Sequence, residues 1–173
     1  GRRGVLCTNA AYHGNSDLVG RLTNVGRTQP ESEEIRSFPF PDLYRPIAEE
    51  LSEEELEDAY LATVRQAIER FEASGIGLAA MLVCSIFANE GLPNLPGRFM
   101  ARAAAMVRDA GGLVIADEVQ AGFGRTGHWW GYEATGFQPD IVTMGKPMGN
   151  GVPVSATGAS RSLIERFRGR TDY

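Results

Sequence analysis

The sequence predicts an α/β fold in which a mainly parallel, mixed sheet is flanked by helices. Short apolar runs, which suit strands covered on both faces, alternate along the chain with longer segments whose apolar residues recur at helical spacing. The chain has 173 residues, of which 43% are hydrophobic and 23% charged, and this is the size and composition of one globular domain.

The first half of the chain predicts one strand, one long loop and one helix. Residues 4–8 form a short apolar run that predicts a buried strand, and a turn at 12–15 follows it. The segment 28–46 is rich in proline, which disrupts regular structure, and it therefore predicts a long surface loop. A capping box at 52–55 opens a run of apolar residues at helical spacing, and the predicted helix closes at 74–75.

The second half alternates between strands and helices. Because strands that alternate with helices form parallel crossover units, this half predicts the centre of a doubly wound sheet. The predicted strands cover 79–87, 113–117, 141–144 and 154–158, and the predicted helices cover 97–110 and 160–168.

Charge and composition exclude several classes of partner. The net charge is −5 without a basic cluster, which argues against nucleic acid and anionic membranes and favours small molecules. No apolar run approaches the ~18 residues of a membrane span and no signal segment opens the chain, so a cytoplasmic protein is expected. Cys7, Cys84, His13 and His128 show no zinc spacing, so no metal site is expected.

Lys146 stands out because it is the only lysine among 17 basic residues. A lysine amine, unlike an arginine guanidinium, can lose its proton and attack a carbonyl. Asp117 and Lys146 each follow an apolar strand and are 29 residues apart, close to the ~30 residues of a strand-crossover-strand unit. Both side chains are therefore expected at one edge of the sheet. Two interpretations stay open: an acid and an amine that face one crevice, or a structural ion pair in which Asp117 also caps a turn.

Three neighbouring patterns suggest rival chemistries. The run 122–127 matches G-x-G-x-x-G, but it does not follow its strand at once and opens no amphipathic helix, so a nicotinamide-dependent oxidoreductase is a remote alternative. The run 145–147 lacks the Ser or Thr of a phosphate-binding P-loop. Glu118 follows Asp117 directly and is expected to face the opposite way, which predicts a structural role for it.

Two longer motifs carry a family resemblance. Residues 113–127 (LVIADEVQAGFGRTG) and 139–151 (PDIVTMGKPMGNG) together resemble the signature of class III aminotransferases, which are pyridoxal phosphate (PLP) enzymes of fold type I. The resemblance implies that 1–173 is part of the PLP-binding large domain, with the N-terminal phosphate loop region and the C-terminal small domain outside it. It also implies a homodimer for the full-length protein.

The same resemblance implies roles for two catalytic residues. Lys146 would hold PLP as a Schiff base and then move the α proton of the substrate. Asp117 would face the pyridine nitrogen and keep it protonated, so that the ring can accept an electron pair.

Further cofactor-binding residues follow from the resemblance. Gln120 would hydrogen-bond the 3-hydroxyl of PLP, and Val119 would pack under the ring. The run 11–14 looks like the family's cofactor-stacking turn, in which Tyr12 would stack on the other face of the ring, and His13 and Gly14 would complete the turn.

The implied reaction transfers an amino group between an amine or amino acid and an oxo acid or aldehyde. Where family members commonly carry Glu-Pro after the strand, this chain has Cys84-Ser85, which keeps open a lyase, decarboxylase or aminomutase, such as a phospho-lyase acting on a phosphorylated amino alcohol. A cofactor-free structural homologue is a further alternative. Residues 1–173 alone are expected to be inactive or weak.

Overall fold

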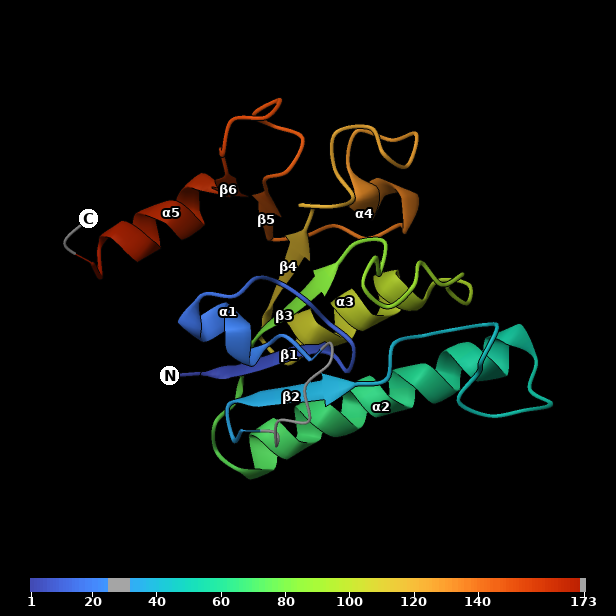
Figure 1. Ribbon diagram of the computed structural model, residues 1–173. Coiled ribbons are helices and arrows are strands. Elements are labelled where there is room, and N and C mark those ends of the chain that lie inside the picture. The colour runs from blue at the N-terminus through green and yellow to red at the C-terminus, as the bar shows by residue number, and fades with distance from the viewer. Residues whose placement is uncertain (25–31, 172–173) are drawn as a thin grey trace.

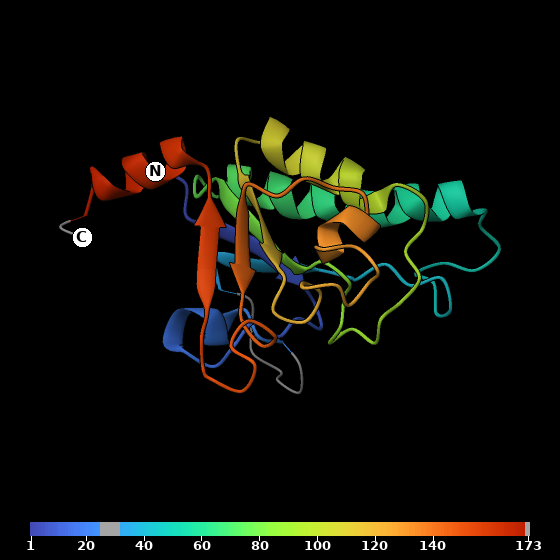
Figure 2. The ribbon, with the colours of Figure 1, turned by 90° about the horizontal axis from the view of Figure 1, so that it is seen from above.

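The computed structural model describes residues 1–24 and 32–171, which form one sheet with helices on both of its faces (Figure 1). The strands lie in the order β2-β1-β3-β4-β5-β6, and every neighbouring pair is parallel except β5 and β6. The two arrows of that last pair point in opposite directions in Figure 2. Their bounds are β1 (Gly4–Thr8), β2 (Ile35–Phe38), β3 (Leu78–Cys84), β4 (Leu113–Asp117), β5 (Ile141–Met144) and β6 (Ala156–Ala159). The mixed, mainly parallel sheet is thus confirmed.

The helices are α1 (Asp17–Arg21), α2 (Glu53–Ala73), α3 (Phe99–Asp109), α4 (Gly131–Ala134) and α5 (Arg161–Arg168). The predicted capping box starts α2: Ser52 Oγ accepts a hydrogen bond from the Glu55 backbone, and the Glu55 side chain accepts one from the Ser52 backbone. None of the helices in the described residues is both long and apolar enough to cross a membrane.

Alternate residues of the central strands build two apolar layers. The larger layer lies between the sheet and the helices α2 and α3, which pack against each other on the same side of the sheet (Figure 2). Val114 and Ala116 of β4 belong to it. Ile115 faces the opposite, smaller layer with Cys7 and Leu82. Because side chains alternate along a strand, Asp117 continues the face of Ile115 at the end of β4.

The structure corrects three of the sequence predictions. The segment 28–46 contains the strand β2, which pairs with β1 from Ile35 to Phe38, so the prediction of an irregular loop is wrong there; residues 28–31 lie outside the described residues. The proline-free stretch before Pro39 is free to donate to a sheet edge, which explains the strand. The strand predicted at 79–87 ends at Cys84, and a loop follows. The short helices α1 and α4 were not predicted.

Candidate active site

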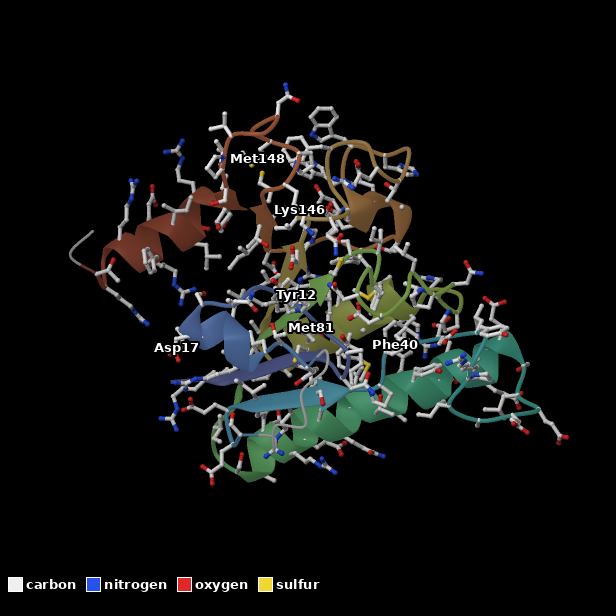
Figure 3. All side chains as sticks on the ribbon, in the orientation of Figure 1. Tyr12, Asp17, Phe40, Met81, Lys146 and Met148 are labelled. Atoms are coloured by element: carbon white, nitrogen blue, oxygen red, sulfur yellow. The ribbon has the colours of Figure 1, made fainter. Side chains whose placement is uncertain are left out.

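Asp117 and Lys146 lie at the same edge of the sheet. Asp117 is the last residue of β4, and Lys146 stands two residues beyond the end of β5. The two strands are parallel neighbours in which Asp117 pairs with Thr143, and the Glu118 backbone donates a hydrogen bond of 2.8 Å to the Thr143 carbonyl. The carboxyl ends of both strands therefore meet, as the spacing predicted. Figure 3 shows Lys146 in the loop after β5 and Tyr12 in the loop after β1.

The Asp117 carboxylate is held at both oxygens. Its Oδ2 lies 2.8 Å from His13 Nδ1, and its Oδ1 accepts the Val119 backbone N–H at 3.0 Å. The side chains of Asp117 and His13 are 11% and 2% exposed, so solvent screens this contact weakly. Asp117 thus does cap the turn that follows β4, while the side chain in contact with its carboxylate is His13.

Lys146 is exposed and keeps its amine available. Among residues 1–24 and 32–171 no carboxylate lies within ion-pairing distance of its Nζ. The structural ion pair between Asp117 and Lys146 is therefore wrong. An amine that is committed to no carboxylate in the described chain is able to react.

The loops after β4 and β5 touch beside these two residues. A Cβ placed on Gly145 would lie 3.7 Å from Val119 Cγ2, which is ordinary van der Waals contact. The half-buried Val119 therefore lies close to the residue that precedes Lys146. It lies between the strand end that carries the acid and the strand end that carries the amine.

Tyr12 and Gln120 are joined through Asn89. Asn89 Nδ2 donates to the Tyr12 carbonyl at 3.3 Å, and Gln120 Nε2 lies 3.5 Å from Asn89 Oδ1. The Tyr12 side chain remains 38% exposed, and its hydroxyl accepts a hydrogen bond from Asn15. The loop after β3 thus connects the loops after β1 and β4.

Gly14 is required by the backbone of the turn after β1. Its φ is +124°, a conformation that residues with a side chain rarely adopt, and a Cβ there would meet Val19 Cγ2 at 3.3 Å. Thr23 Oγ1 donates to the Gly14 carbonyl at 2.9 Å and fixes the turn from the other side. The turn therefore presents Tyr12 and His13 in one defined orientation.

Glu118 organises the loop on the opposite side of β4. It is 0% exposed, and its carboxylate accepts hydrogen bonds from the backbones of Gly131 at 2.7 Å and Tyr132 at 3.0 Å and from the Ser85 hydroxyl. This agrees with the structural role expected from strand alternation. The glycine-rich loop is held so that it returns to α4 and does not open a dinucleotide-binding helix, which removes the support for a nicotinamide site.

Cys84 lies beside Asp117 in the β-ladder and is 3% exposed. Burial raises the pKa of its thiol from 9.0 to about 11, and the charges of Asp117 and Glu90 add to the shift. Since the thiolate is the nucleophilic form, Cys84 is unreactive near neutral pH. It occupies the end of β3 as a small core residue.

The sequence analysis missed the polar residues of the loop after β3. Asn89 joins Tyr12 to Gln120, and Glu90 accepts a hydrogen bond from Thr8 at the end of β1. Burial raises the pKa of Glu90, while the Thr8 hydrogen bond and the charge of His13 oppose the shift. Both residues follow the predicted strand at 79–87 within three positions, so the rule that picked out Asp117 could also have picked out Asn89 and Glu90.

A cavity of about 720 Å³ lies at the other end of the sheet. It is lined by the first residues of β4 and β5, Leu113 and Ile141, and by Ile164 and Phe167 of α5. It is thus separated from Asp117 and Lys146 by the length of the strands. The side chains that can do chemistry are not those that line it.

The groups at the carboxyl edge suit pyridoxal phosphate. They include a free amine, a buried carboxylate, an exposed aromatic ring and a side-chain amide, from Lys146, Asp117, Tyr12 and Gln120. Each Asp117 oxygen receives one donor, and a carboxylate oxygen has two lone pairs, so Asp117 can accept one more hydrogen bond.

Comparisons with known proteins show the family to which the chain belongs. A model of the class III aminotransferases matches residues 1–171. An alanine–glyoxylate aminotransferase 2-like protein of Drosophila melanogaster is 33% identical over 96% of this chain and 35% of its own length. Two solved structures overlay closely. A phospholyase from Arthrobacter in complex with phosphoethanolamine has a TM-score of 0.90 and 38% identity over 98% of this chain and 40% of its own. An omega transaminase of Pseudomonas jessenii in complex with PMP has a TM-score of 0.87 and 25% identity over 99% and 38%.

The fold and the matched structures define the class as fold type I enzymes that depend on pyridoxal phosphate. Within this class, the chain belongs to the class III aminotransferase family, whose known members include transaminases and phospho-lyases. The chain spans 35–40% of the length of the relatives described above.

Proposed function

We propose that the full-length protein containing this chain is a PLP-dependent transaminase. It transfers an amino group between an amine or amino acid and an oxo acid or aldehyde. The observation that carries the proposal is the Asp117 carboxylate, fixed by His13 at 2.8 Å, at the same sheet edge as the Lys146 amine, which pairs with no carboxylate of residues 1–24 and 32–171. Membership of the class III aminotransferase family supports the same reaction.

When bound, PLP supplies an aldehyde that condenses with amines and a protonated ring that accepts electrons. Asp117 would hold the ring nitrogen of the cofactor and keep it protonated, because its carboxylate is buried and fixed by contacts at both oxygens. His13 acts through Asp117: its Nδ1 lies against Oδ2, and its own side chain is 2% exposed. His13 thus positions the acid.

Lys146 would hold the cofactor and would then move the α proton of the substrate. Lys146 is exposed and lies beyond the end of β5, next to Gly145. A Cβ placed on Gly145 would lie within van der Waals distance of Val119. A lysine amine can both attack a carbonyl and accept a proton, and these are the two tasks the reaction requires of it.

Tyr12, Val119 and Gln120 orient the cofactor ring. Tyr12 offers an exposed aromatic face from one loop and Val119 an apolar face from another. Gln120 presents an amide toward the 3-hydroxyl, with Asn89 as its support. Gly14 serves by allowing the turn that carries Tyr12.

A phospho-lyase acting on a phosphorylated amino alcohol is the second candidate. The Arthrobacter phospholyase in complex with phosphoethanolamine is 38% identical to this chain with a TM-score of 0.90. Cys84 and Ser85 at the end of β3 leave this strand end without the carboxylate that family members commonly carry there. Both reactions use the same Asp117 and Lys146 and differ in what leaves the substrate.

We further propose that residues 1–173 belong to the large, cofactor-binding domain of a cytoplasmic homodimer, and that isolated residues 1–173 have weak activity or none. The coverage of 35–40% of the relatives' lengths supports a larger protein. The dimer rests on the family resemblance, and the compartment is the expectation drawn above from the sequence.

The test incubates the full-length protein with PLP and a panel of amines and amino acids, with a 2-oxo acid as acceptor. Formation of the amino acid derived from the oxo acid identifies a transaminase. Release of phosphate and ammonia from phosphoethanolamine identifies the lyase instead. Lys146→Ala and the charge-preserving control Lys146→Arg should both abolish turnover, since neither side chain supplies a reactive amine. Turnover in either variant that equals the wild-type rate contradicts the proposal.

A further inference from the structure

Behind Asp117 lies a second acid, Glu90, that the proposed reaction does not use. Glu90 stands in the loop after β3, and its Oε1 accepts a hydrogen bond from the hydroxyl of Thr8, the last residue of β1. Thr8 is 1% exposed, so this contact anchors the acid in the protein interior. The other oxygen, Oε2, is buried and has no hydrogen-bond partner in the described chain.

His13 carries a matching unpaired atom. Its Nδ1 contacts Asp117 Oδ2 at 2.8 Å, but its Nε2 is buried without a hydrogen-bond partner among the described residues. An unpaired buried polar atom is destabilising, and two such atoms close together are uncommon unless something joins them. One is an imidazole nitrogen, which can donate a hydrogen bond, and the other is a carboxylate oxygen, which can accept one.

The side chains of His13 and Glu90 also interact electrostatically. The charge of His13 lowers the pKa of Glu90, although burial outweighs it and raises that pKa overall. The charges of Asp117 and Glu90 both raise the pKa of Cys84, so both acids lie near the end of β3. The titratable groups that face His13 and Glu90 from the surrounding elements are thus Asp117 at the end of β4 and Cys84 at the end of β3.

We propose that Glu90 is a positioning residue for Asp117 and acts through His13, whose Nε2–H donates to Glu90 Oε2 through one bridging water. A water in a polar buried site is stable when it has two to four polar partners, and this bridge supplies two of them. The bridge keeps a proton on Nε2 while the Nδ1 proton faces Asp117. Asp117 then always meets a donor, which makes its hydrogen bond charge-assisted and fixes its orientation.

This inference rests on the proposed function. The orientation of Asp117 matters for that function because Asp117 would face the cofactor. A purely structural role is the alternative: Glu90 could do no more than tie the loop after β3 to Thr8. The two roles separate by substitution. Glu90→Gln keeps an oxygen for Thr8 but removes the charge, whereas Thr8→Val removes the anchor and keeps the carboxylate.

The experiment records ¹⁵N spectra of histidine side chains in the full-length protein without cofactor at pH 7. The His13 signals are assigned by their loss in His13→Asn. Wild type is expected to show protons on both ring nitrogens of His13, with a slowly exchanging Nε2–H. That Nε2–H signal is lost in Glu90→Gln and kept in Thr8→Val. Glu69→Gln, which changes an exposed acid on α2, leaves the spectrum unchanged.

Three outcomes overturn the proposal. The first is a wild-type spectrum with a proton on only one His13 nitrogen, which needs no variant to fold. The second is an Nε2–H signal that survives in Glu90→Gln. The third is an equal loss in Thr8→Val, which assigns Glu90 the structural role. Because no cofactor is present, these results are independent of whether Lys146 binds PLP.

Discussion

Asp117→Asn separates the chemical role of Asp117 from its structural one. Asparagine has nearly the same shape as aspartate, so its oxygen can still accept the Val119 N–H that Asp117 Oδ1 accepts at 3.0 Å. Its amide can donate to His13 Nδ1, across the present 2.8 Å contact, once Nδ1 has given up its proton. Both contacts are thus remade, and we expect the free energy of unfolding to change by about 1 kcal/mol or less.

Asparagine does not replace the negative charge that Asp117 supplies to the reaction. The Asp117 side chain is 11% exposed, so its charge acts with little screening, and a hydrogen bond to a charged group contributes about 1.5–3 kcal/mol. If that contribution appears in the transition state, proton removal slows by about 10- to 150-fold, at 1.36 kcal/mol for each factor of ten.

Single-turnover absorbance measurements of the amine half-reaction test this rate in the full-length protein. Urea unfolding and retention of the cofactor on gel filtration serve as controls. A rate within threefold of wild type would refute the role of Asp117, as would a loss of cofactor affinity as large as the loss of rate.

Two further changes test the surroundings of the site. Glu118→Gln places an amide N–H group opposite one of the backbone N–H groups that now donate to the carboxylate. We therefore expect the free energy of unfolding, measured in urea, to fall by about 2 kcal/mol. The exposed Glu133→Gln, which affects only the hydrogen bond from Trp130, should cost under about 1 kcal/mol; equal effects would contradict the buried role. For Cys84, the folded pKa of about 11 exceeds the ordinary 9.0, so its stabilising contribution is complete below pH 9 and lost as pH rises through 11. From pH 8 to pH 10, wild type should lose about 1.4 kcal/mol more stability than Cys84→Ala, and parallel pH curves would contradict the shift.

The spacing of apolar residues in the sequence was sufficient to predict the strands and helices that bury apolar residues at regular intervals. The strand at Leu113–Asp117 and the helix behind Ser52 agree with their predicted positions, because a run of branched apolar residues and a capping box are local signals. The shared edge of Asp117 and Lys146 also followed from sequence, since the spacing matches one crossover unit.

The remaining features depend on contacts between distant segments. The strand Ile35–Phe38 exists because β1 offers it a partner, which no local pattern reveals. His13 and Asp117 are 104 residues apart, so their 2.8 Å contact arises from the tertiary fold alone. The contacts of Asn89 with Gln120 and of Glu90 with Thr8 likewise join residues 31 and 82 positions apart, so no local pattern reveals them.

The most direct measurement is covalent labelling of Lys146 in the full-length protein. After incubation with PLP, the protein is reduced with borohydride, digested and analysed by mass spectrometry. The account predicts a visible absorbance band that reduction removes, and a pyridoxyl adduct on the peptide that contains Lys146. Absence of the band, or an adduct on a different lysine with Lys146 unmodified, would contradict it.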